Sequence, residues 1–213
     1  MLKAIIFDCW STLIKKDAPQ PSSIYKYLNW EERETEKAVG EIFMLEPIKD
    51  LRSQTIKFLD ILKIKYNEEA IEGVIDILAD EYVNYNIPYD KTLETLERLK
   101  LDYSLGLITN STDLAFEPLR KKYSFDKIFD KIIASYEVGL IKPDPRIFEL
   151  ALGKLGVKSK EALMVGDNPI NDLQAARAVG IKGLMLDNKN KYPNYTPRIA
   201  SITEIFNYLS QNL

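Results

Sequence analysis

Short apolar runs alternate with segments of helical period through most of the chain, and this alternation sets the fold class. The runs, rich in Ile, Leu and Val, cover residues 4–7, 104–108, 131–134, 162–165 and 183–186. The clearest helical segment covers residues 145–155, with apolar side chains at i, i+3, i+4 and i+7, Pro145 at its start and Gly156 at its end. A second covers about residues 171–179. Strands that alternate with helices predict an α/β protein with a parallel sheet covered on both faces.

One stretch of the chain interrupts this alternation. Residues 14–88 show no strand pattern, but they contain helical segments at about residues 31–45, 53–63 and 68–85. We therefore expect a helical domain at residues 14–88, inserted into a core domain of residues 1–13 and 89–213. The aromatic residues of this insertion are expected to pack in its interior. They are Tyr25, Tyr27, Trp30, Phe43 and Phe58.

Composition excludes several kinds of site. The 213 residues include no histidine and one cysteine, Cys9, so Ser-His-Asp and Cys-His triads are excluded, as is a structural zinc site with four Cys or His ligands. Any bound metal ion must therefore be held by oxygen. The formal net charge of −3 argues against a broad basic surface for nucleic acid. We expect a small-molecule partner and no nucleic-acid partner.

Hydropathy predicts where the protein is located. The apolar run before Asp8 is too short for a signal peptide, and no stretch of the sequence approaches 18 consecutive apolar residues. We therefore expect a cytoplasmic protein without a membrane partner. The oligomeric state does not follow from the sequence.

Polar side chains follow the predicted strands at the edge where ligands bind in an open parallel sheet. They are Asp8, Thr109, Asn110, Lys142, Asp167 and Asp172. Three carboxylates beside one ammonium group resist ionising together in a partly desolvated crevice. A divalent cation would balance them, and a site with oxygen ligands that also takes a phosphate suits Mg²⁺.

Four segments of the chain resemble, in order, the motifs of the haloacid dehalogenase-like (HAD) hydrolase superfamily. They are residues 7–13 (FDCWSTL), 108–110 (ITN), 139–145 (GLIKPDP) and 165–172 (VGDNPIND). The resemblance implies a Rossmann-like core, with a parallel sheet and helices on both faces, and a small all-helical cap domain inserted after the first motif. That is where the helical insertion at residues 14–88 lies.

The resemblance also implies roles for individual residues. Asp8 attacks the substrate and forms an aspartyl intermediate, while Thr109 and Lys142 hold the transferring group. Asn110 and Lys142 are expected to contact the substrate. The expected Mg²⁺ ligands are Asp8, Trp10 through its main-chain carbonyl, Asp167 and Asp172.

Trp10 departs from the phosphatase pattern. Most phosphatases of the superfamily have a second Asp at this position, which protonates the leaving group and then activates water. Indole offers an N–H donor that does not titrate at usable pH, and a positioned general acid-base contributes roughly 10²- to 10⁴-fold in rate. In having an aromatic residue at this position, the chain resembles the 2-haloacid dehalogenases of the same superfamily. The halide that those enzymes displace leaves without needing a proton. Those enzymes, however, work without a metal and lack the acid at the position of Asp167.

The sequence therefore favours a Mg²⁺-dependent phosphatase that acts on a small phosphorylated metabolite. Asp167 and Asp172 carry this preference, because metal ligation has few substitutes, whereas a good leaving group can cover the loss of a general acid. Two alternatives stay open: a metal-independent 2-haloacid dehalogenase-like hydrolase, and a catalytically weak protein that binds a phosphorylated metabolite. We interpret Arg33, which lies among Glu and Lys residues, as part of a solvated charged face.

Overall fold

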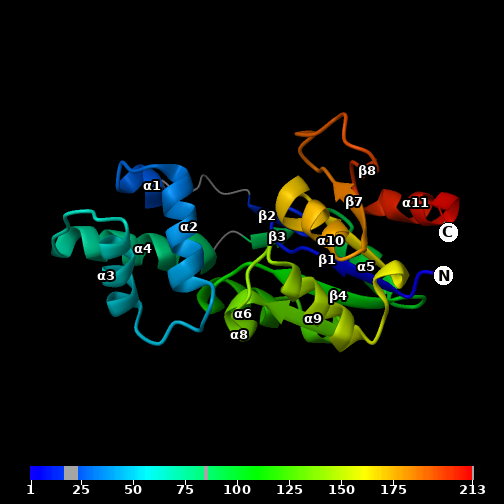
Figure 1. Ribbon diagram of the computed structural model, residues 1–213, viewed down its shortest axis with the longest axis horizontal. Helices are drawn as coiled ribbons and strands as arrows, with labels where there is room; N and C mark the ends of the chain where they lie inside the picture. Colours follow the sequence, from blue (N-terminus) through cyan, green and yellow to red (C-terminus); the bar gives the residue numbers. More distant parts are fainter. Residues whose placement is uncertain (17–23, 84–85, 213) are drawn as a thin grey trace.

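A parallel sheet forms the centre of the protein. The computed structural model describes residues 1–16, 24–83 and 86–212 (Figure 1). Six strands lie in the order β5-β4-β1-β6-β7-β8, and every neighbouring pair is parallel. They are β1 (Ala4–Phe7), β4 (Ser104–Thr109), β5 (Lys131–Ala134), β6 (Ala162–Gly166), β7 (Lys182–Leu186) and β8 (Arg198–Ile199). The predicted strands are confirmed to within one residue at each end. Strand β8 was missed, because two residues carry no periodicity.

Helices cover both faces of the sheet, as expected for a Rossmann-like fold. On β1, Ile5 and Phe7 join one apolar cluster while Ile6 joins the other, because successive side chains of a strand point to opposite faces. The helices that follow residue 88 are α5 (Thr92–Leu99), α6 (Asp113–Lys122), α7 (Phe125–Ile128), α8 (Ser135–Val138), α9 (Pro145–Leu155), α10 (Ala175–Ala178) and α11 (Ile205–Asn212). Short turns of 3₁₀ or π helix are η1 (Ser159–Glu161), η2 (Pro169–Gln174) and η3 (Ile202–Glu204). The predicted helix at 145–155 is confirmed as α9, and that at 171–179 is divided between η2 and α10.

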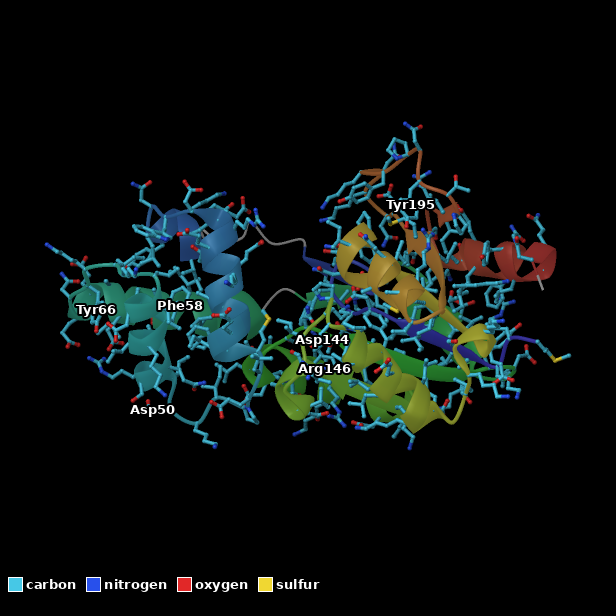
Figure 2. The ribbon with its side chains drawn as sticks, in the orientation of Figure 1. Asp50, Phe58, Tyr66, Asp144, Arg146 and Tyr195 are labelled. Atoms are coloured by element: carbon cyan, nitrogen blue, oxygen red, sulfur yellow. The ribbon has the colours of Figure 1, made fainter. Side chains whose placement is uncertain are left out.

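The predicted insertion is mainly helical and has its own core. Its helices are α1 (Ile24–Tyr27), α2 (Glu32–Phe43), α3 (Leu51–Ile61) and α4 (Glu68–Val83), which lie together beside the sheet and its helices (Figure 1). Phe43 and Phe58 are fully buried among them, with ring centroids 5.6 Å apart. The side chain of Asp50 caps the start of α3, because it accepts hydrogen bonds from the main-chain N–H groups of Arg52 and Ser53. Figure 2 shows Asp50 and Tyr66 at the periphery of the helical region.

Two expectations for the insertion were wrong. It contains a short antiparallel pair of strands, β2 (Ile14–Lys16) and β3 (Asn86–Pro88), although no strand was expected. Strands of three residues show no alternation, and each is stabilised by a partner far away in the sequence, so a local pattern cannot reveal them. This pair lies where the chain enters and leaves the helical region.

The second wrong expectation concerns the aromatic residues. Tyr27 and Trp30 are 40% and 38% exposed rather than buried. Their polar atoms explain this, because the Tyr27 hydroxyl donates to the Glu69 carbonyl and the Trp30 indole N–H donates to the Glu34 carboxylate, both at 3.1 Å.

In the described part of the chain, no helix is long and apolar enough to cross a membrane.

Candidate active site

A buried trio of charges lies at the carboxyl ends of the central strands. Asp8 follows directly after β1, and its main-chain N–H donates to the Val165 carbonyl of the neighbouring strand. The Lys142 ammonium lies 2.6 Å from Asp8 Oδ1 and 2.6 Å from Asp172 Oδ1. All three residues are at most 6% exposed. The structure therefore brings the expected nucleophile, the expected lysine and one of the expected metal-site acids together.

Thr12 is a member of this site that the sequence analysis missed. Its hydroxyl donates to Asp8 Oδ2 at 2.7 Å and accepts a hydrogen bond from the Asp167 main-chain N–H at 3.1 Å. Thr12 therefore fixes the second oxygen of Asp8 and links the first motif to the fourth. The available signal was a hydroxyl four residues after Asp8, on a turn that begins at Cys9 and includes Ser11 with a positive φ of 64°.

The end of strand β6 is shaped to receive Asp172. A Cβ atom at Gly166 would lie 2.4 Å from Asp172 Oδ2 and 2.6 Å from its Cβ and Cγ, so a side chain there would collide with the carboxylate. The Asn168 main-chain N–H donates to Asp172 Oδ2 at 3.0 Å. Both oxygens of Asp172 thus have partners, Lys142 and the backbone at Asn168.

Carboxylates are crowded in this site. Asp8, Asp167 and Asp172 each offer one oxygen, and these oxygens all lie within 4.8 Å of one another. Burial, together with the charges of Asp8 and Asp172, raises the pKa of Asp167 to about 7. Burial also raises the pKa of Asp172 to about 6, although Lys142 opposes the increase. Burial lowers the pKa of Lys142, but the carboxylates of Asp172 and Asp8 outweigh it and hold this pKa above its ordinary value.

These residues fit a hard divalent cation. The cluster offers carboxylate oxygens without histidine or cysteine, the donor set that Mg²⁺ prefers. Burial first, and the neighbouring carboxylates second, raise the pKa of Asp167, and a bound cation would favour the ionised carboxylates. Trp10 is half-buried and packs against the apolar cluster that contains Ile5, and the metal role expected for its carbonyl stays a prediction.

The second motif provides a hydroxyl and an amide. Thr109 is the last residue of β4 and is fully buried, and within the described part of the chain its hydroxyl has no hydrogen-bond partner. The Asn110 side chain contacts Lys142 on two sides: its amide N–H donates to the Lys142 carbonyl at 2.9 Å, and its oxygen accepts from the Lys142 main-chain N–H at 2.8 Å. The substrate contact expected of Asn110 stays a prediction.

A cleft of about 770 Å³ connects this site with the helical region. Asn110 and Lys142 line it on the core side, and much of α2 lines the other side, including Arg33. Arg33 is exposed, as expected for a charged face, and that face also borders the cleft. Helix α2 lies close to the core here, since a Cβ atom at Gly40 would come within 3.0 Å of Ile141.

The fold and the site together define a class of protein: a Rossmann-like α/β protein with an aspartate cluster at the carboxyl edge of its sheet and a helical region beside it. Residues 2–180 match the haloacid dehalogenase-like hydrolase family, and the chain belongs to that family. It is therefore an enzyme of the hydrolase class. This confirms the family resemblance seen in the four sequence motifs.

Relatives of the chain include both haloacid dehalogenases and phosphatases. The chain is 25% identical to (S)-2-haloacid dehalogenase 4A of Burkholderia cepacia, over 100% of this chain and 96% of the relative. It is 30% identical to the glyceraldehyde 3-phosphate phosphatase of Methanocaldococcus jannaschii, over 96% of each. A solved structure of a predicted phosphoglycolate phosphatase from Haemophilus somnus superposes with a TM-score of 0.68 at 22% identity, over 98% of each chain, and shows the same fold.

Proposed function

We propose that this hydrolase is a Mg²⁺-dependent phosphatase that acts on a small phosphorylated metabolite through an aspartyl-phosphate on Asp8. The observation that carries the proposal is the cluster of Asp8, Asp167 and Asp172, with oxygens within 4.8 Å of one another. Without a cation, such a cluster would repel the carboxylate of a haloacid as well as a phosphate. The phosphatases among the relatives support the same assignment.

In this proposal, Asp8 attacks phosphorus and displaces the leaving group, and water then hydrolyses the aspartyl-phosphate. Lys142 and Thr12 hold the two oxygens of Asp8 at 2.6 and 2.7 Å, which fixes the carboxylate for attack. Lys142 and the hydroxyl of Thr109, which has no hydrogen-bond partner among the described residues, stabilise the transferring phosphoryl group. Bound Mg²⁺, held by Asp8, Asp167, the Trp10 carbonyl and Asp172, would neutralise negative charge on the phosphate and the carboxylates.

The helical region supplies the other wall of the substrate site. We propose that residues 14–88 act as a cap domain on the core of residues 1–13 and 89–213. Its helix α2 faces Asn110 and Lys142 across the 770 Å³ cleft, so closure of the cap would exclude water from the phosphoryl group. The residues of α2 that border this cleft would then select the metabolite.

Trp10 favours a second candidate, a 2-haloacid dehalogenase-like hydrolase. This residue cannot protonate an alkoxide leaving group, whereas a halide needs no proton. The 25% identity to a haloacid dehalogenase over the whole chain agrees with this candidate. The two functions differ in their need for a metal ion. A protein that binds a phosphorylated metabolite with little turnover is the third possibility.

Release of inorganic phosphate tests the proposal. The substrates are para-nitrophenyl phosphate and acetyl phosphate, each with Mg²⁺ and with EDTA. Wild-type protein is compared with Asp8→Asn, and Asp102→Asn is the matched control because Asp102 is exposed on a turn just before β4, at the opposite end of that strand from Thr109. The proposal expects activity that requires both Mg²⁺ and Asp8. If the protein has no phosphatase activity but releases chloride from 2-chloropropionate in EDTA, the dehalogenase function replaces the proposed phosphatase function. If phosphate stabilises the protein against heat without any turnover, the protein only binds its ligand.

A further inference from the structure

We propose that Asn110 is a positioning residue: it fixes the main chain of Lys142, and thereby the ammonium group that holds Asp8, in place of the substrate contact expected from its motif. The kinetic part of this inference rests on the proposed phosphatase function. Its structural part does not, because it concerns the geometry of the protein without substrate.

Two complementary hydrogen bonds carry the proposal. The Asn110 amide N–H donates to the Lys142 carbonyl at 2.9 Å, and the Lys142 N–H donates to the Asn110 oxygen at 2.8 Å. A carboxamide offers both a donor and an acceptor in one plane, so it can satisfy both main-chain groups of a single residue. An aspartate of the same shape would offer acceptors alone and would face the Lys142 carbonyl with negative charge.

The surroundings of Lys142 explain why it needs such a contact. It lies between α8 and α9, in a segment at residues 139–144 without helix or strand. From this segment a long, flexible side chain must place its ammonium group 2.6 Å from both Asp8 and Asp172. Asn110 comes directly after β4, which pairs with β1, the strand that Asp8 follows. The contact therefore ties the loop of Lys142 to the same rigid sheet that positions Asp8.

The position of Asn110 in the cleft is consistent with both roles, so the experiment must separate them. A residue that binds substrate changes substrate affinity when it is removed. A residue that positions Lys142 changes the environment of the lysine even when no substrate is present. We therefore follow the lysine itself.

The test is acetylation of lysines by limiting acetic anhydride in EDTA, without substrate, quantified at each lysine by mass spectrometry. The full-length wild type is compared with Asn110→Ala and with the isosteric Asn110→Asp. Lys100 is the internal control, because its ammonium also donates two hydrogen bonds, to the carbonyls of Lys127 and Ile128 at 2.9 Å each, away from the site. In both variants we expect acetylation of Lys142 to rise about tenfold or more, the factor for loss of two ordinary hydrogen bonds, with Lys100 unchanged.

Two results would overturn the proposal. Acetylation of Lys142 that stays at the wild-type rate would show that Asn110 does not position it. A parallel rise at Lys142 and Lys100 would show that Asn110 supports the core in general. A wild type without phosphatase activity would disprove the proposed function but would leave this labelling result intact.

Kinetics provide the second readout where the phosphatase function holds. For para-nitrophenyl phosphate, Asn110→Ala should lower kcat by about 10²-fold, the effect of a misplacement near 1 Å. Asn207→Ala, an exposed asparagine on α11, should behave as wild type. A higher KM with an unchanged kcat would assign Asn110 to the substrate and contradict the proposal.

Discussion

The ammonium group of Lys142 lies 2.6 Å from Asp8 Oδ1, although the two residues are 134 positions apart in the sequence. The same ammonium lies 2.6 Å from Asp172. Lys142 is thus the cation that lets two buried carboxylates lie side by side, and it does so from a loop that Asn110 holds. The stability of the site and its chemistry therefore depend on the same few contacts.

Lys142→Met should destabilise the protein when no metal is bound. Removing one partner of a buried ion pair typically costs about 3–5 kcal/mol, because the other charges stay buried without compensation. Here Asp8 and Asp172 would face each other and Asp167. Urea unfolding in EDTA measures the loss, and excess Mg²⁺ should restore part of it by binding the folded state.

Arg146→Met is the control for this change. Arg146 pairs with Asp144 at the start of α9, at 2.6 Å, but its side chain is 70% exposed (Figure 2). Solvent screens such an exposed pair, so its loss should change the free energy of unfolding much less than the loss of the Lys142 pairs. Equal losses for the two variants would show that the Lys142 pairs are no stronger than surface pairs.

Gly166→Ala should damage the site through a collision. The added methyl would lie 2.4–2.6 Å from atoms of Asp172, so either the strand end or the carboxylate must move. We expect a loss of about 1–3 kcal/mol in the free energy of unfolding and weaker Mg²⁺ binding. Urea unfolding and titration calorimetry measure the two effects.

The matched control is Gly153→Ala, on the exposed side of α9, where a Cβ atom would meet nothing within 4 Å. Alanine in a helix is favoured over glycine by about 0.5–1 kcal/mol, so this variant should gain stability. A Gly166→Ala variant as stable as wild type, with normal Mg²⁺ binding, would contradict the close packing of Asp172.

The sequence predicted the core of this fold well, for a physical reason. Strands β1 and β5 were located to the residue because a buried parallel strand is a continuous apolar run bounded by polar residues. The same runs located Asp8 and Asp167, since the first polar residue after such a strand lies at its carboxyl end. Strands β2 and β3 escaped because their stability comes from pairing with each other rather than from local pattern.

The contacts inside the site were harder to predict. The roles of Thr12 and Asn110 depend on distances between side chains that no spacing encodes. Thr12 contacts Asp8 through a turn in which Ser11 has a positive φ. This conformation is uncommon for serine, so the sequence does not predict it. The substrate contact expected of Asn110 stays a prediction, and no spacing in the sequence indicated that its side chain bonds to the backbone of Lys142. The sequence indicated which residues gather, and the structure shows which of them touch.

The metal-free protein should lose stability as the pH rises through the titration of its buried acids. The pKa of Asp167 is raised to about 7 and that of Asp172 to about 6, from a usual value of 3.8. Between about pH 4 and pH 7 the folded state keeps protons that the unfolded state has released, so the free energy of unfolding falls by up to roughly 1.4 kcal/mol per pH unit for each retained proton. Urea unfolding in EDTA from pH 5 to pH 8 measures this slope.

Two comparisons check the cause of the slope. Asp167→Asn should reduce it, because one of the titrating groups is gone. Saturating Mg²⁺ should flatten it, because the cation favours the ionised carboxylates. A stability that rises with pH over this range in EDTA would mean that the three carboxylates are compensated without a metal.

Trp10→Asp should raise turnover of alkyl phosphates. Trp10 lies two residues after Asp8 and has no group that can protonate an alkoxide, so the wild type should hydrolyse acetyl phosphate and para-nitrophenyl phosphate much faster than glycerol phosphate. An aspartate at this position could act as a general acid and then as a base, which is worth roughly 10²- to 10⁴-fold. The control is Trp10→Phe, which keeps an aromatic ring against the apolar cluster but adds no acid. A gain of equal size in Trp10→Phe would mean that the indole obstructs the site. If Trp10→Asp is folded but hydrolyses glycerol phosphate no faster than the wild type, proton transfer does not limit the rate of this enzyme.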